Sequence, residues 1–211
     1  MNHIVLLGDS IFDNHAYVHG GRAVIEHVRS SLPSGWQATL LARDGTMTAG
    51  VVHQLDAVPD DASQLVVSAG GNDALEHAGM VLYEPAASFS EVMSRLAQIQ
   101  TEFRQQYRQM LGALMALDKP TMVCTVYDTI PTIEPSLIAA LSLFNDAIVR
   151  EANCAGLAVL DLRQTCTEAT DYAGIWPIEP SEAGGAKIAR AILRAVTTPL
   201  SDWPGCRMLG Q

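Results

Sequence analysis

Short apolar runs alternate with segments of helical periodicity along the chain. The first run, Ile4 to Leu7, has no polar residue, which is the pattern of a strand buried on both faces of a parallel sheet. Helices that alternate with such strands cover the two faces of the sheet. We therefore expect a single α/β domain over residues 1–200 and a peripheral tail at 201–211. The predicted strands are 4–7, 36–42, 65–69, 122–126 and 157–160.

Apolar residues at helical spacing mark the segments between these strands. Ser88 and Glu91 form a capping box, and the helix that they open carries apolar residues to about Leu117. A partner-binding face would have the same apolar stripe, but a face packed on the sheet is favoured. Thr48 can cap a short helix. The other predicted helices begin near 22, run from 137 to 154 and run from 181 to 196.

The composition is that of a globular chain with an acidic balance. Of the 211 residues, 48% are hydrophobic and 17% are charged, which suits one domain with a full core. The formal net charge of -10 disfavours nucleic acid as a partner. Without a leader-like segment after Met1 or an apolar run of membrane-spanning length, we expect a cytoplasmic protein. The cysteines lack metal-binding spacing and are expected to be reduced thiols: Cys124, Cys154, Cys166 and Cys206.

Polar and glycine-rich segments follow the first three predicted strands. They contain Ser10, then 43–45 (Arg-Asp-Gly), then 70–73 (Gly-Gly-Asn-Asp). Each alone is an ordinary turn sequence, but the carboxyl ends of parallel strands share one edge, where ligands bind. Ser10 is therefore a candidate nucleophile. The backbone N–H groups of Ser10 and Gly45 and the side-chain amide of Asn72 are candidate donors to an oxyanion.

Four motifs, in this order, resemble those of the SGNH or GDSL hydrolases. They are G-D-S-I at 8–11, D-G-T-M-T-A-G at 44–50, G-G-N-D at 70–73 and I-E-P-S-E-A-G-G-A-K-I-A at 178–189. The resemblance implies a flavodoxin-like three-layer α/β/α sandwich with a five-stranded parallel sheet. It also implies esterase-type activity on a small-molecule ester or acyl substrate, without a cofactor. Ser10 would be the nucleophile, and Gly45 and Asn72 would be oxyanion donors.

The last motif departs from the pattern of this family. That block normally reads Asp-x-x-His-Pro, with the histidine as general base, but here Glu179 precedes Pro180 and Trp176 stands where the aspartate belongs. All six histidines lie within the first 77 residues, so no small shift of the alignment restores the base. The usual Ser-His-Asp triad cannot be assembled from this block.

Three interpretations of the missing base remain. Glu179 could be the base itself if burial raises the pKa of its carboxyl towards neutrality. Glu179 could instead pair with Arg43, which would hold it ionised as a weaker base, and we slightly favour this pair. His15, in the loop after Ser10, could serve as the base or contact the substrate. Other residues that could support the site are Asp9, Tyr17 and Asp171.

Two functions are therefore open. The retained Ser10, Gly45 and Asn72 favour a serine-dependent hydrolase with a non-standard general base. The missing histidine favours a catalytically silent protein that binds an acylated or carbohydrate ligand in the same crevice. Neither function fixes an oligomeric state.

Overall fold

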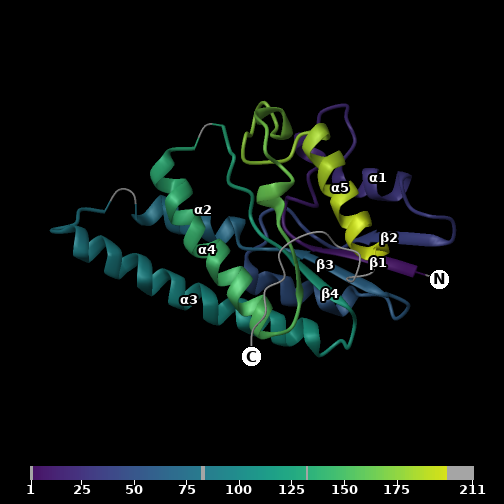
Figure 1. Ribbon diagram of the computed structural model, residues 1–211, viewed down its shortest axis with the longest axis horizontal. Coiled ribbons are helices and arrows are strands. Elements are labelled where there is room, and N and C mark those ends of the chain that lie inside the picture. The colour runs from purple at the N-terminus through teal and green to yellow at the C-terminus, as the bar shows by residue number, and fades with distance from the viewer. Residues whose placement is uncertain (1, 82–83, 132, 199–211) are drawn as a thin grey trace.

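A computed structural model describes residues 2–81, 84–131 and 133–198 (Figure 1). Five parallel strands form one sheet in the order β2-β1-β3-β4-β5, the flavodoxin-like order, which confirms the expected fold class. The predicted tail at 201–211, with Cys206, lies outside the described residues. The strands are β1 (Asn2–Gly8), β2 (Trp36–Leu40), β3 (Gln64–Ser68), β4 (Thr121–Cys124) and β5 (Ala158–Leu160).

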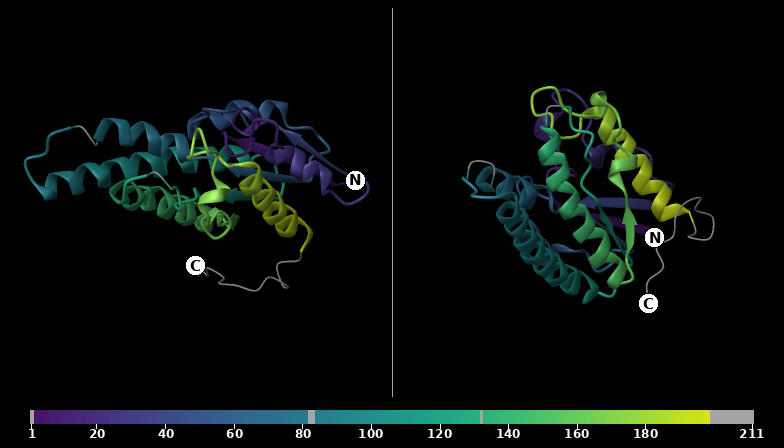
Figure 2. Two further views of the ribbon diagram at one scale, coloured as in Figure 1. Left: turned by 90° about the horizontal axis from the view of Figure 1, so that it is seen from above. Right: turned by 60° about the vertical axis from the view of Figure 1, so that its left-hand side comes forward.

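Helices cover both faces of the sheet, as the two views of Figure 2 show. Alternate residues of β1 point to opposite faces, so Ile4 and Leu6 join one core cluster, and Val5 and Leu7 join another. The first cluster includes α1 (Val24–Ser30) and α5 (Glu182–Thr197). The second includes η2 (Thr48–Ala57), α3 (Phe89–Met115) and α4 (Pro135–Cys154). The fold is therefore a three-layer α/β/α sandwich.

The close approach of β1 and β3 fixes the point where the chain leaves the sheet. Gly8 lies opposite Ser68 and has a φ of 118°, a conformation that L side chains rarely adopt. A Cβ atom at this position would overlap the Ser68 carbonyl oxygen. Only glycine fits here, immediately before Asp9 and Ser10.

Two local predictions were incomplete. The segment after β3 reads as a turn because of its glycines, yet α2 (Gly71–Val81) begins there. Thr48 does not cap a helix but is the first residue of the 3₁₀ helix η2, which Met47 precedes. The Thr48 backbone N–H and hydroxyl both donate to Asp73, because that buried carboxylate needs partners.

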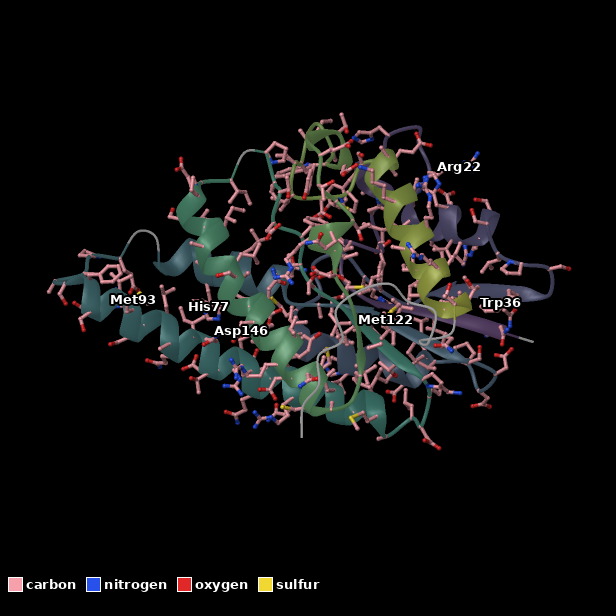
Figure 3. All side chains as sticks on the ribbon, in the orientation of Figure 1. Arg22, Trp36, His77, Met93, Met122 and Asp146 are labelled. Atoms are coloured by element: carbon pink, nitrogen blue, oxygen red, sulfur yellow. The ribbon has the colours of Figure 1, made fainter. Side chains whose placement is uncertain are left out.

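The long helix α3 packs on the sheet over only part of its length. Phe103, Tyr107 and Leu114 are buried in the core, which agrees with the prediction. Nearer the start of α3, Phe89 and Met93 are exposed. Figure 1 shows α2, α3 and α4 extending together past the sheet, and Figure 3 labels Met93 in that part. Among the described helices, none combines the length and apolar character needed to cross a membrane.

Candidate active site

Buried polar groups fix the segment that carries Ser10. The Gln54 side chain accepts a hydrogen bond from the Gly8 N–H and donates one to the Gly8 carbonyl oxygen, both at 2.8 Å. The Asp9 carboxylate accepts from the Ile11 N–H at 3.2 Å, which turns the chain after the strand. Ser10 therefore follows β1 in a rigid, buried turn.

The Ser10 hydroxyl donates a hydrogen bond to Glu179, with 2.9 Å between Oγ and Oε1. The other carboxylate oxygen of Glu179, Oε2, is buried and has no hydrogen-bond partner in the part of the chain that the structure describes. Burial raises the pKa of Glu179 to about 7, and the nearby charge of Asp44 adds to the rise, against the opposing effect of the bond from Ser10. Near neutral pH this carboxylate can accept and release a proton.

Hydrogen bonds on both sides hold the backbone around Glu179. The Tyr127 hydroxyl donates to the carbonyl oxygen of Ile178 at 2.6 Å, and the Asn14 side chain donates to that of Pro180 at 3.1 Å. Tyr127 and Asn14 could not be selected for this role from sequence patterns, because their partners lie 51 and 166 residues away. The sequence places Asn14 only in the loop after Ser10, and its burial is a finding of the structure.

The ends of β2 and β3 bring the candidate oxyanion donors to the same edge. The Asn72 side chain donates to the carbonyl oxygen of Thr46 at 3.0 Å, which joins the start of α2 to the loop that contains Gly45. Gly45 has a φ of 75°, which favours glycine. Within the described parts of the chain, the backbone N–H groups of Ser10 and Gly45 have no hydrogen-bond acceptor. Both N–H groups can donate to a new partner, but Ser10 lines the cavity whereas Gly45 is exposed and does not line it.

The expected pair between Arg43 and Glu179 is wrong. Arg43 is exposed, and among the described residues it forms no ion pair. Glu179 is instead buried: one carboxylate oxygen accepts from Ser10, and the other has no partner within residues 2–81, 84–131 and 133–198. The tight turn after β2 exposes the arginine, so the shared strand edge alone did not bring the two charges together.

The other supporting candidates lie outside the Ser10 cavity, except Asp9. His15 is exposed on η1 (His15–Tyr17) and has no hydrogen bond to Ser10. Tyr17 donates to Asp44 at 2.7 Å, which raises the pKa of Tyr17 to about 12. Asp171, at the end of η4 (Ala169–Asp171), is buried in an ion pair of 2.8 Å with Lys187. These contacts give Asp171 a structural role instead of a place at the cavity.

A cavity of about 450 Å³ connects the site residues. Asp9, Ser10, Asn72 and Glu179 all line it. Burial raises the pKa of Asp9 to about 7. His77 of α2 also lines the cavity, although the sequence offered no motif around it (Figure 3). Among the described residues, no group of three or more His, Cys, Asp and Glu side chains is arranged to hold a metal ion.

Known structures share this fold at low sequence identity. A lipase from a goat rumen metagenome matches with a TM-score of 0.71 at 17% identity, over 93% of this chain and 97% of the lipase. A member of the lipolytic G-D-S-L family from Veillonella parvula has a TM-score of 0.68 at 17% identity, over 93% and 99%. A variant of an acetyl xylan esterase from Geobacillus stearothermophilus has a TM-score of 0.65 at 14% identity, over 92% and 94%. No protein-family model and no curated protein matches the sequence. The chain therefore has the fold of the GDSL, or SGNH, hydrolases.

Proposed function

We propose that the protein is a serine-dependent hydrolase of small esters or other acyl compounds, with Glu179 as its general base. The observation that carries this proposal is the 2.9 Å hydrogen bond from the Ser10 hydroxyl to Glu179. A nucleophilic hydroxyl needs a base within hydrogen-bond reach, and the Glu179 pKa of about 7 suits proton transfer at neutral pH. The fold that the chain shares with lipases and esterases supports the same reaction class.

In the first half of the reaction, Glu179 takes the proton of Ser10 while the serine oxygen attacks the ester carbonyl. The negative charge that develops on the carbonyl oxygen is stabilised by the N–H groups of Ser10 and Gly45 and by the amide of Asn72. Protonated Glu179 then gives its proton to the departing alcohol. The products of this half are the alcohol and an acyl group bound to Ser10.

In the second half, a water molecule replaces the alcohol. Glu179 takes a proton from this water, whose oxygen attacks the acyl carbonyl, and the same donors stabilise the second oxyanion. The bond to the serine oxygen breaks, Ser10 regains its proton from Glu179, and the carboxylic acid leaves. Asn14 and Tyr127 act as positioning residues, because they hold the backbone on either side of Glu179.

The proposal is tested by reaction with p-nitrophenyl butyrate and with a fluorophosphonate. We expect a burst of p-nitrophenol and addition of one phosphonyl group at Ser10, located by mass spectrometry of the digested protein. Ser10→Ala should lose both reactions, and its melting temperature, compared with that of wild type, shows that the variant is folded. Equal ester hydrolysis by wild type and Ser10→Ala would refute the proposal.

A further inference from the structure

The cavity at Ser10 continues well beyond the reacting groups. Its volume of about 450 Å³ lies within the range of about 300–1,000 Å³ that is typical of pockets for small-molecule ligands. An acetyl group would occupy only a small part of such a space. The remaining volume lies between α2, α3 and α4, where these helices extend past the sheet (Figure 1).

Each of the three helices turns an apolar face towards this space. The lining residues recur at intervals of three or four, the spacing that places side chains on one face of a helix. Examples are Ala74 and Ala78 of α2, Leu96 and Ile99 of α3, and Leu137 and Ala140 of α4. The start of the α3 stripe therefore lines the cavity, whereas its later residues pack on the sheet.

Helix geometry gives the depth of the cavity along α2. Asn72 lies in the first turn of α2, beside the loop of Gly45. Ala78 follows six residues later, which is about 9 Å along the axis at about 1.5 Å per residue. Both residues line the cavity, so its wall extends at least this far from the candidate oxyanion donors.

The opposite wall on α4 has a similar depth. The Asn145 side chain bonds the N–H and the carbonyl oxygen of Val126, just after β4, both at 2.8 Å. Ala140 comes five residues earlier on α4, about 7.5 Å along the axis towards the end that projects past the sheet. His77 and Phe144 both line the cavity and are in ring contact with each other, with ring centroids 6.1 Å apart.

Polar side chains are concentrated where the reaction would occur. Asp9, Ser10, Asn72 and Glu179 lie at the strand ends. Away from the strand ends, the polar lining residues are His77 of α2, Ser136 of α4 and Glu84. Glu84 lies between α2 and α3 and forms an ion pair of 3.0 Å with Arg95. A carbohydrate would leave its hydroxyl groups without partners along the apolar walls, which is costly. A hydrocarbon chain needs no such partners.

We propose that this cavity binds an extended, unbranched acyl chain, longer than acetyl, whose carbonyl carbon lies at Ser10. This proposal rests on the proposed hydrolase function and specifies its substrate class. The acyl carbonyl is held at the polar end of the cavity, and the hydrocarbon extends between α2, α3 and α4. The alcohol part of the ester lies outside this cavity.

The test compares kcat/KM for p-nitrophenyl acetate, butyrate, octanoate and dodecanoate. In the wild-type protein, each methylene that enters the cavity should raise kcat/KM by about fourfold, the effect of removing a methylene from water. The increase should end when the chain fills the cavity. A wild-type preference for acetate, with a decline on every longer chain, would overturn the proposal.

Two substitutions narrow the cavity from opposite walls, and a neighbouring position supplies a matched control. Ala140→Phe and Ala78→Phe should each lower the ratio of octanoate to acetate kcat/KM on the order of 100-fold, the effect of three to four excluded methylenes. Ala139→Phe should leave this ratio unchanged, because Ala139 is exposed on the same helix and does not line the cavity. The proposal is overturned if both cavity variants fold and keep the wild-type ratio.

Direct binding separates this proposal from the proposed hydrolase function. If no ester is hydrolysed and Ser10 is not labelled, the hydrolase function fails. Displacement of a fluorescent fatty acid by dodecanoate then decides whether the cavity is an acyl site. Binding by wild type and Ala139→Phe, weakened in Ala140→Phe, would support the acyl site, and absence of binding by wild type would overturn it.

Discussion

The hydroxyl of Ser10 lies 2.9 Å from one carboxylate oxygen of Glu179, and the other oxygen of this carboxylate is buried with no hydrogen-bond partner among the described residues. No imidazole lies between the candidate nucleophile and the candidate base. The acid–base group is therefore in direct contact with the nucleophile. Its proton affinity depends on burial, because burial is the largest influence on the raised pKa of Glu179.

Replacing Glu179 with glutamine should remove the base while keeping the size of the side chain. The amide oxygen of glutamine can still accept the hydrogen bond from Ser10, but it cannot take up the proton. We expect kcat for p-nitrophenyl butyrate to fall by about 100- to 10,000-fold, the usual contribution of general acid–base catalysis. A melting temperature equal to or above that of the wild type would show that the fold is kept. Wild-type kcat in a folded Glu179→Gln protein would exclude Glu179 as the base.

Ester hydrolysis should increase with pH through a midpoint near the Glu179 pKa of about 7. Below this pH the carboxyl is protonated and cannot accept the proton of Ser10, and above it the ionised form predominates. Asp9 has a pKa of about 7 in the same cavity, so the profile of wild type alone does not identify the group. The plot of kcat/KM against pH should keep its rise in Asp9→Asn and lose it in Glu179→Gln. The reverse result would assign the titration to Asp9.

Asn72→Ala should lower kcat more than it changes KM. An oxyanion donor acts mainly in the transition state, and loss of one such donor typically lowers kcat about 100- to 1,000-fold. The substitution also removes the bond of 3.0 Å to the Thr46 carbonyl oxygen, so a control for the loop is needed. Two results would show that the site is intact. One is labelling of Asn72→Ala by an alkylating probe that does not form an oxyanion, and the other is an unchanged melting temperature. A rise in KM at constant kcat would contradict the assignment of Asn72 as an oxyanion donor.

Local patterns in the sequence were enough to predict the strands and the edge that carries Ser10 and Asn72. Parallel pairing brings the carboxyl ends of all the strands to one edge, but it does not set their order, in which β1 separates β2 from β3. The partner of Glu179 could not be predicted in the same way, because the burial of its carboxylate depends on residues far apart in the chain. The pattern of α3 also concealed the cavity, since an apolar stripe looks the same whether it meets a sheet or lines a hollow.

Asp9→Asn should change how the stability of the fold depends on pH. Burial raises the pKa of folded Asp9 from 3.8 to about 7. Between these values the unfolded chain has released this proton and the folded chain still holds it, so wild-type stability falls as pH rises through this window.

Asparagine cannot ionise, and it keeps an oxygen that can accept from the Ile11 N–H. The free energy of unfolding of Asp9→Asn minus that of wild type should therefore be about 4 kcal/mol larger at pH 8 than at pH 4, which means that the variant is relatively more stable at pH 8. Urea denaturation at both pH values measures this difference. Asp56→Asn, on the exposed side of η2, serves as the control. If the unfolding free energies of Asp9→Asn and wild type depended equally on pH, Asp9 would ionise as readily in the folded protein as in the unfolded chain.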